Sequence, residues 1–271
     1  MRYVTSREYK FLLRHKKFVD FDKACRNFWR YLGDTAKSQK LRTKERKAEP
    51  EHREIEFLDT EDRTIFNAGL LLRRRTAADG AVQFTLKCRS PDRYLADGAD
   101  LSPAPKQGFD EDDVDRKFEE DVGVPFVSRF SQSTSITFPH GKVGKQALHL
   151  DQAAKVFPIL KHLGRDRRAK ANPVLKVVGK QRIAEQVFRG PDLVFRSEAK
   201  KVKAQTALIV WHIDGRPAPA VVEFSFRYKA KKERVSPLVS RQAMTLYRAL
   251  QETVWFDPAV DSTKTSFVYR S

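Results

Sequence analysis

The chain of 271 residues carries 53 lysines and arginines against 35 aspartates and glutamates, a formal net charge of +18. Its 40% hydrophobic content excludes intrinsic disorder and allows one large domain or two small ones, and its two cysteines, without ligand spacing, argue against a disulfide framework or a zinc site. Such a charge favours nucleic acid, polyphosphate or an anionic surface as partner, although a solvated basic surface would also account for it.

A strand and a helix are predicted at the start of the chain. The strand covers residues 3–13 and places Ser6, Glu8 and Lys10 on one face, because side chains alternate along a strand. The helix begins soon after, with apolar residues at helical spacing, and Gly33 stands where a C-terminal glycine belongs.

An arginine-rich hairpin is the most informative part of the sequence. Read as strands, the segments around Arg73 and Arg75 and around Lys87 are joined by an Asp79-Gly80 turn. All three cations then point to one side of the sheet. Cations held this close repel one another unless an anion lies between them, so a polyanion such as phosphate is the expected ligand.

Two segments interrupt the pattern of strands. Residues 34–53 are polar and basic and are predicted to form a mobile loop. Residues 88–132, with three prolines and an acidic cluster, are interpreted as an inserted loop region, either a lid over a basic site or a solvated loop.

Strands dominate the second half of the chain. One strand between 173 and 188 carries Lys180 and Arg182, and another carries Glu223. About eight strands with charged residues on one face predict an α+β, β-dominated fold. We expect an eight-stranded antiparallel closed barrel, or tunnel, with peripheral helices and room for one small ligand. No apolar run has the length of a signal or a membrane span, so a cytoplasmic protein without a membrane partner is expected.

Several motifs resemble those of the CYTH family, the triphosphate tunnel metalloenzymes. The segment Ser6-Arg7-Glu8-Tyr9-Lys10 is similar to its Glu-x-Glu-x-Lys motif, and Asp59 to Arg75 to its Asp-Thr…Leu-x-Leu-Arg-x-Arg segment. Thr85-Leu86-Lys87 and Val222 to Ser225 resemble its Thr-Leu-Lys and Glu-x-Glu strands. The match covers residues 3 to 13, 54 to 90 and about 173 to 230, and the order of the motifs along the chain gives it weight.

The resemblance implies one tunnel domain over residues 1–271 that hydrolyses a phosphoanhydride bond with Mg²⁺ or Mn²⁺. By resemblance, the residues that bind the phosphates are Lys10, Arg73, Arg75, Lys87, Lys180 and Arg182. The metal ligands would be Glu8 and Glu223, and the catalytic residues Glu8, Lys10 and Glu223.

Two serines depart from the family pattern. Ser6 and Ser225 stand where the family has glutamates, so a second metal would be poorly held and a two-metal mechanism is in doubt. Asp214 would restore a carboxylate if it faces inward, but an aspartate before Gly215 is also a usual turn residue.

Three functions therefore compete. The first is metal-dependent hydrolysis of a triphosphate or short polyphosphate, and the second is a non-catalytic module that binds polyphosphate or a phosphorylated ligand in the same tunnel. The third, ranked last, is nucleic-acid binding, because the aromatic residues lie in apolar stripes rather than among the basic residues. The sequence names neither the ester group nor the oligomeric state.

Overall fold

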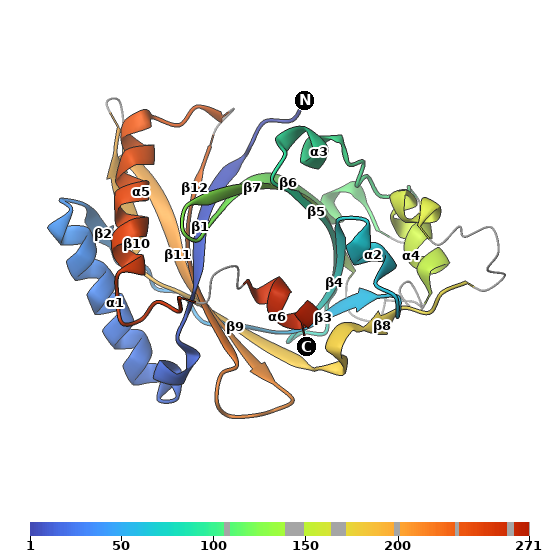
Figure 1. Cartoon of the computed structure of the whole chain (residues 1–271), viewed down its shortest axis with the longest axis horizontal. Coiled ribbons are helices and arrows are strands. Elements are labelled where there is room, and N and C mark those ends of the chain that lie inside the picture. Colours follow the sequence, from blue (N-terminus) through green and yellow to red (C-terminus); the bar gives the residue numbers. More distant parts are fainter. Residues whose placement is uncertain are drawn as a thin grey trace.

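The computed structural model describes residues 1–105, 109–138, 149–163, 172–197, 201–230, 233–258 and 263–270 (Figure 1). The strands are β1 Ser6–Leu13, β2 Arg42–Lys44, β3 Glu51–Asp59, β4 Leu70–Ala77, β5 Val82–Ser90, β6 Val114–Gly123, β7 Val127–Phe138, β8 Lys176–Val177, β9 Ile183–Arg189, β10 Asp192–Arg196, β11 Lys201–Ile213 and β12 Val221–Lys229. The α-helices are α1 Phe21–Ser38, α2 Thr64–Asn67, α3 Arg93–Gly98, α4 Leu150–Val156, α5 Pro237–Gln251 and α6 Lys264–Arg270. Short 3₁₀ turns are η1 His15–Phe18, η2 Glu111–Asp113, η3 Pro158–His162 and η4 Val178–Lys180.

Nine strands close into a barrel, which Figure 1 shows end-on. Around the ring the order is β12, β1, β6, β7, β5, β4, β3, β9 and β11, and β11 pairs again with β12. β1 and β6 are parallel, whereas the other neighbouring pairs of the ring are antiparallel. Three further strands lie at the margins, where β10 pairs with β11, β2 with β10 and β8 with β3.

The predicted closed, β-dominated barrel is confirmed, but the predicted strand number and the purely antiparallel pairing were wrong. The difference lies in β6 and β7, since β6 and the beginning of β7 fall within residues 88–132, predicted as an inserted loop region. Ser6 in β1 and its partner Glu119 in β6 are 113 residues apart, and parallel pairing at that distance has no local turn signal.

The predicted loop regions also hold regular structure. Residues 88–132 contain the end of β5, then α3 and β6, and the beginning of β7, while 106–108 lie outside the described residues. Residues 34–53 contain the end of α1, then β2 and the beginning of β3. The helix α1 continues past Gly33 to Ser38 because Leu32 and Ala36, four residues apart, both stay buried against the barrel.

The apolar core lies mainly outside the barrel wall. In β1, Tyr9 and Phe11 point outward and are buried, whereas Glu8 and Lys10 point into the barrel. Helices α1 and α5 cover this outer face, and Phe11 packs against Tyr247 of α5 with ring centroids 5.6 Å apart. Burying these aromatic surfaces drives the helices onto the sheet.

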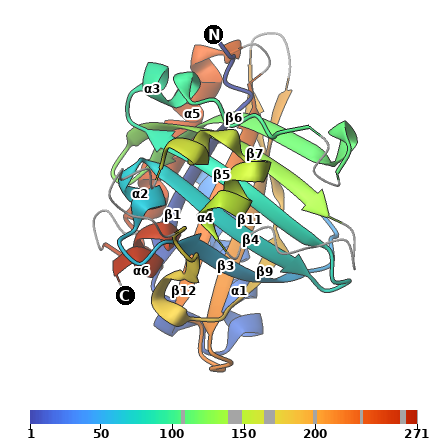
Figure 2. The same ribbon diagram turned by 90° about the vertical axis from the view of Figure 1, so that its right-hand side faces the viewer.

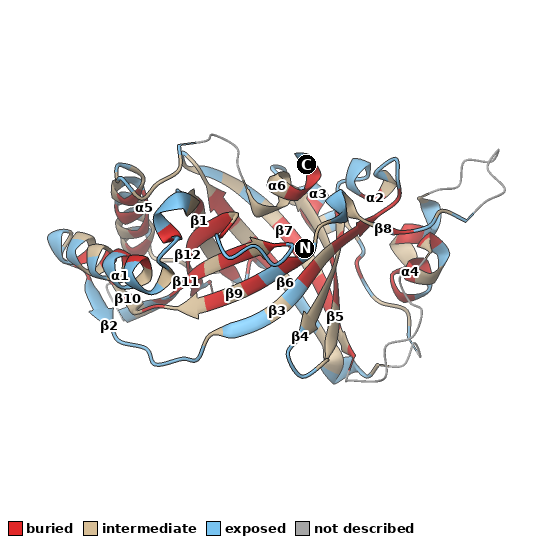
Figure 3. Ribbon diagram, turned by 90° about the horizontal axis from the view of Figure 1, so that it is seen from below, coloured by how far each residue is buried: buried red, intermediate tan, exposed pale blue. Residues whose placement is uncertain are grey.

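A second apolar cluster covers the opposite side of the barrel. It joins Leu72, Leu86 and Ile136 of the wall to Ala153 of α4 and Leu160 of η3. Figure 2 shows α4 in front of β4 and β5, and Figure 3 shows α1 and α5 at one end of the molecule with α4 at the other. Among the described helices, none is long and apolar enough to cross a membrane.

The C-terminal helix α6 occupies a different position from the other helices. It lies within the outline of the ring in Figure 1, rather than on the outside of the wall as peripheral helices would. Val268 and Tyr269 of α6 pack against Phe57 and Trp211, which point from the wall into the barrel. One end of the barrel is therefore covered by an apolar layer that includes α6.

Candidate functional site

A cavity of about 400 Å³ lies inside the barrel. Its lining contains ten basic and four acidic residues, so the wall presents an excess of positive charge. The basic residues are Lys10, Arg53, Arg73, Arg75, Lys87, Arg89, Lys117, Arg189, Arg227 and Lys264, and the acidic ones are Glu8, Asp115, Glu119 and Glu223. Positive charge enclosed by a low-dielectric wall concentrates anions.

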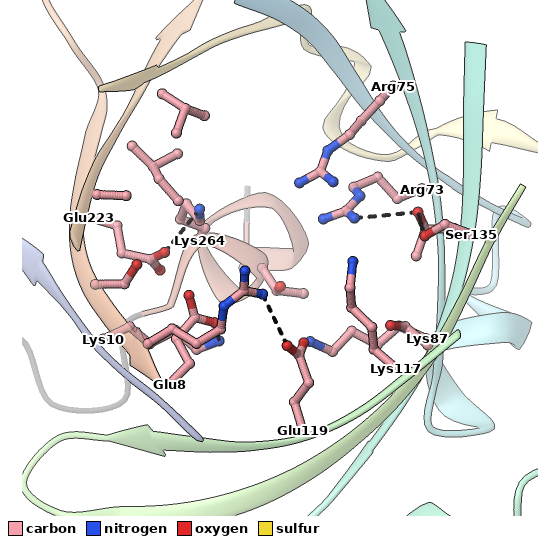
Figure 4. A pocket seen from close by; sticks show the side chains of 18 of the residues that line it. Glu8, Lys10, Arg73, Arg75, Lys87, Lys117, Glu119, Ser135, Glu223 and Lys264 are labelled. Carbon is pink, nitrogen blue, oxygen red and sulfur yellow. Dashed lines mark hydrogen bonds and ion pairs between the residues drawn. The ribbon is translucent and has the colours of Figure 1, made fainter. Parts of the chain in front are cut away.

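The β4–β5 hairpin forms the most basic part of this wall. Arg73 pairs across the sheet with Thr85, and Leu71 pairs with Lys87, so the inward positions of the two strands alternate as predicted. Figure 4 shows Arg73, Arg75 and Lys87 pointing into the cavity from one side. The hairpin therefore brings together the three cations that the sequence analysis selected.

Arg73 is the least compensated of these cations. Its Nη2 donates a long hydrogen bond of 3.4 Å to Thr85 Oγ1. Within the described residues, Arg73 has no acidic partner, and the buried Nε atoms of Arg73 and Arg75 have no hydrogen-bond acceptor. Buried donors without acceptors are rare in folded proteins, and these are in position to meet a ligand in the cavity.

Burial makes the charged state of these groups unfavourable. Burial and the neighbouring Arg75 hold the pKa of the Arg73 guanidinium well below its usual range. Burial lowers the pKa of Arg75 to about 10, against the attraction of Glu185. Burial also lowers the pKa of Lys87 to about 8, against the attraction of Asp121. An anion that pairs with these groups would relieve the penalty of keeping them charged.

Glu8 and Lys10 enter the cavity from β1, as predicted, on the side opposite Arg73 (Figure 4). Lys10 Nζ lies 3.1 Å from Glu8 Oε2 and 2.7 Å from Asp121 Oδ1. Asp121 Oδ2 also accepts a hydrogen bond of 2.6 Å from Arg89. Burial alone would raise the pKa of Asp121, but nearby cations, led by Lys10, outweigh it and hold that pKa well below its usual range. Asp121 thus fixes the positions of several cations at once.

Glu223 enters from β12 and meets a lysine of α6. Lys264 Nζ lies 2.9 Å from Glu223 Oε1 and 3.9 Å from Glu185 Oε2. Glu185 also accepts hydrogen bonds from Trp211 Nε1 at 2.8 Å and from Arg53 Nε at 2.5 Å. Burial alone would raise the pKa of Glu185, but the surrounding cations, led by Lys264, lower it to about 2. Glu185 is therefore held as a carboxylate, and Lys264 joins it to Glu223.

The two serines that depart from the family pattern lie near carboxylates. Ser6 Oγ donates a hydrogen bond of 2.7 Å to Glu119 Oε1, and Arg227 Nη1 lies 3.3 Å from the same oxygen. Ser225 lines the cavity beside Glu223 on β12. Glu119, from the strand that pairs with β1, thus supplies a carboxylate next to Ser6.

Lys180 and Arg182 are not brought to the cavity. They lie in η4 and just before β9, where the chain turns, and Lys180 has a positive φ of 53°. Both side chains are exposed, and the Arg182 backbone N–H donates to Asp214 Oδ1 at 3.0 Å. Asp214 is therefore a turn residue, with φ of 52°, and adds no carboxylate to the cavity.

Sequence reasoning missed Arg53, Arg89 and Arg189 of the wall, together with the site residues of β6 and α6. Along β6, Asp115, Lys117, Glu119 and Asp121 recur at every second position, and three of them line the cavity. This alternation is the same signal that identified β1, so it could have been recognised. Lys264 belongs to no periodic pattern, and only the tertiary structure places it beside Glu223.

The carboxylates of the cavity are paired with cations. Among the described residues, no three His, Cys, Asp or Glu side chains lie close enough together to hold a metal ion. Glu8 is paired with Lys10, and Glu223 with Lys264. Mg²⁺ and Mn²⁺ require available oxygen ligands and repel a neighbouring ammonium. The donor set in this arrangement therefore does not fit either ion.

Comparisons with known proteins place the chain near a set of solved structures. No protein-family profile and no curated protein matches it, but 14 chains of solved structures do. One is a proposed adenylyl cyclase from Hippeastrum with a dominant triphosphatase activity, at 11% identity and a TM-score of 0.46, covering 98% of this chain and 95% of that chain.

Two further matches are proposed adenylate cyclases of bacteria. The protein from Bacillus halodurans has 12% identity and a TM-score of 0.39 over 99% of this chain and 100% of its own. That from Vibrio parahaemolyticus has 10% identity and a TM-score of 0.36 over 100% of both chains. The chain is thus similar over nearly its whole length to structures of this kind, and the activities named are those of the matched proteins.

Proposed function

We propose that the barrel cavity binds the phosphate chain of a triphosphate or short polyphosphate. The observation that carries this proposal is Arg73, which is half-buried at the cavity, with a buried Nε that has no hydrogen-bond acceptor and no acidic partner for its guanidinium among the described residues. Arg75 and Lys87 lie beside it with lowered pKa values. Guanidinium groups bind phosphate oxygens through paired hydrogen bonds, and several cations at fixed positions suit a ligand with several phosphates.

The size of the cavity supports a ligand of this class. A volume of about 400 Å³ is within the range of pockets that hold small molecules. A second cavity of about 730 Å³ adjoins the first, and the two share Lys117, Glu119, Gln205 and Arg227. This second cavity leaves space for further phosphates or for the organic group of a triphosphate ester.

Metal-dependent hydrolysis of a phosphoanhydride bond is the second candidate function. It is favoured by the position of Glu8 and Glu223, whose carboxylates face the arginines across one cavity. Phosphoryl transfer depends on positioning and charge neutralisation, which fixed cations can supply in part. Because both glutamates are bound by Lys10 and Lys264, holding Mg²⁺ or Mn²⁺ there requires another arrangement of these side chains.

Nucleic-acid binding gains no support from the aromatic residues of α1 and β12. Phe28, Phe224 and Phe226 are buried between α1 and the barrel wall, with the rings of Phe28 and Phe224 5.1 Å apart. Buried rings cannot stack on bases. Proteins that bind single-stranded nucleic acid usually combine such stacking with a basic surface.

The two candidates are separated by measuring binding and turnover together. Calorimetry with tripolyphosphate tests binding, and phosphate release from tripolyphosphate, ATP and thiamine triphosphate tests turnover, each with Mg²⁺, Mn²⁺ or EDTA. Binding without release supports the binding module, and release that depends on metal supports hydrolysis. Failure to bind tripolyphosphate under every condition would contradict the proposal.

A further inference from the structure

Lys264 is a cation delivered to the carboxylates of the cavity by α6. Its Nζ lies 2.9 Å from Glu223 Oε1, 3.9 Å from Glu185 Oε2 and 5.6 Å from the centroid of the Trp211 ring. Only 16% of the lysine side chain is exposed. Figure 4 shows Lys264 and Glu223 facing each other on the side of the cavity opposite Arg75.

The helix that carries Lys264 is anchored independently of this ion pair. Tyr269 stacks on Phe66 with ring centroids 4.2 Å apart, and its carbonyl oxygen accepts a hydrogen bond of 2.6 Å from Arg63. Val268 is fully buried in the apolar layer at that end of the barrel. These contacts fix the C-terminal half of α6, so its first residue is held beside Glu223 by the packing of the helix.

The ammonium of Lys264 occupies the position that a cation shared by two carboxylates would take. Glu223 and Glu185 have side chains that are 7% and 0% exposed, and two buried carboxylates need positive charge close by. In the same way, the Lys10 ammonium lies between two carboxylates, 3.1 Å from Glu8 Oε2 and 2.7 Å from Asp121 Oδ1. A divalent ion at either place would meet the repulsion of an ammonium a few ångströms away.

We infer that Lys264 replaces a divalent cation at the Glu223–Glu185 pair, so that the cavity binds phosphate chains without metal. The inference rests on the proposed function, since it concerns how the same cavity is neutralised. Lys264 cancels carboxylate charge that would otherwise repel the phosphates. It also places an ammonium where Mn²⁺ would have to lie between the two carboxylates.

Two measurements on the wild-type protein test this inference. The first is calorimetric binding of tripolyphosphate in EDTA, and we expect binding there. The second is electron paramagnetic resonance of free Mn²⁺ in the presence of the ligand-free protein, and we expect no uptake. Binding of tripolyphosphate only when Mn²⁺ is present would overturn the inference while the proposed function stands. No binding with or without Mn²⁺ would instead contradict the proposed function itself.

Variants at position 264 complete the test. Lys264→Met keeps the length of the side chain and is expected to weaken tripolyphosphate binding in EDTA about tenfold, because it exposes carboxylate charge to the anion. The same variant is expected to take up Mn²⁺. Lys264→Arg keeps the charge and should restore binding in EDTA without uptake, and Lys16→Met removes an exposed lysine far from the cavity as a control.

The outcomes for the variants are decisive in both directions. Gain of Mn²⁺ uptake by Lys264→Met, with thermal unfolding still cooperative, supports the replacement of a metal by the lysine. If Lys264→Met binds tripolyphosphate in EDTA as tightly as the wild type, the lysine does not neutralise the site. If the wild type takes up Mn²⁺ and Glu223→Gln abolishes this uptake, Glu223 is a metal ligand and the inference fails.

Discussion

Arg73 illustrates how a residue proposed to bind phosphate would oppose folding in the absence of a ligand. Its side chain is enclosed by the wall and has Thr85 as its hydrogen-bond partner, while the pKa of its guanidinium lies well below the usual range because of burial and the nearby Arg75. A group in this state destabilises the empty protein, and the phosphate oxygens of a ligand reverse the effect. Affinity and stability should therefore respond in opposite directions when this charge is removed.

Replacing Arg73 by Met should weaken tripolyphosphate binding roughly ten- to a hundredfold, since a charged hydrogen bond contributes about 1.5–3 kcal/mol. The same substitution should raise the free energy of unfolding of the ligand-free protein by about 1 kcal/mol, because an uncompensated buried cation is lost. Calorimetry and urea denaturation measure the two effects. Arg74→Met is the matched control, since Arg74 is the next residue of β4 and pairs with Glu56 instead of facing the cavity. Equal loss of affinity in both variants would contradict the prediction.

The lowered pKa of Lys87, about 8, predicts a pH dependence of binding. Burial is its main cause, and Arg89 and Lys10 add repulsion while Asp121 opposes the shift. A phosphate ligand favours the charged lysine, so the free protein must take up a proton on binding once the pH exceeds about 8. Affinity for tripolyphosphate should then fall about tenfold between about pH 7 and about pH 9.

The pH effect is measured by titrating the wild type and Lys87→Met in the same buffers. Ionisation of the ligand itself is common to both proteins and cancels in the comparison. The variant should bind more weakly at neutral pH and should show a smaller decrease towards alkaline pH. A parallel decrease in both proteins would show that Lys87 does not titrate in this range.

At the scale of elements, the β4–β5 hairpin and β6 show what the sequence can reveal. The hairpin was predicted because its alternation, its Asp79-Gly80 turn and its apolar start all agree, and Gly80 indeed has a φ of 81°. β6 was missed because it follows a stretch with three prolines and begins inside an acidic cluster, which together indicate a loop. Its parallel partner β1 lies far away in the sequence, so neither a turn nor a local contact signals the pairing.

The residues of the candidate site divide in the same way, into those on strands with a clear local pattern and those placed by long-range packing. Glu8, Lys10 and Glu223 were found because each belongs to a strand with clear alternation, and all three reach the cavity. Lys180 was placed on an inward strand, but the chain is still in a 3₁₀ turn at that point. Lys264 could not be found, because its role depends on the packing of α6 across one end of the barrel.

The glycines of α1 and of the β9–β10 connection should respond oppositely to alanine. A methyl group at Gly33 would meet nothing within 4 Å, and the residue is helical, so Gly33→Ala should stabilise the protein by about 0.5–1 kcal/mol. At Gly190 a methyl group would lie 2.6 Å from the Trp29 ring and 2.7 Å from Thr206 Oγ1, so Gly190→Ala should destabilise by about 1–3 kcal/mol. Urea denaturation of both variants checks the contrast, and a stabilising Gly190→Ala would show that Trp29 moves aside at no cost.

At the scale of the whole molecule, the barrel is stabilised from its outside. Apart from the apolar layer at the α6 end, the wall sends charged side chains inward and apolar ones outward, where α1 and α5 cover one side and α4 covers the other. In most small barrels the interior is filled by packed side chains, whereas here the interior holds a charged cavity and most of the apolar core lies outside the wall. This arrangement allows the cavity to keep its charge because the apolar burial that stabilises the fold lies mostly elsewhere.

The formal net charge of +18 predicts how the whole molecule meets an anionic ligand. Long-range attraction accelerates encounter, and salt screens it over about 10 Å at 0.1 M ionic strength. The association rate constant for tripolyphosphate should therefore fall steeply between about 0.05 and 0.5 M salt. Stopped-flow measurements of association and dissociation check this. A salt effect confined to the dissociation rate would contradict long-range steering.

The position of β1 between β6 and β12 determines when the protein can fold during its synthesis. Ser6 pairs with Lys229, so the first strand acquires its antiparallel neighbour only after more than 200 further residues have been made. At roughly 5–20 residues per second, this interval lasts about 11 to 45 s. During that time Tyr9 and Phe11 have none of their partners from β12 and α5, and the ribosome carries a nascent chain with exposed aromatic surface. Closure of the ring thus waits for the synthesis of β12, and until then chaperones have access to the N-terminal strand.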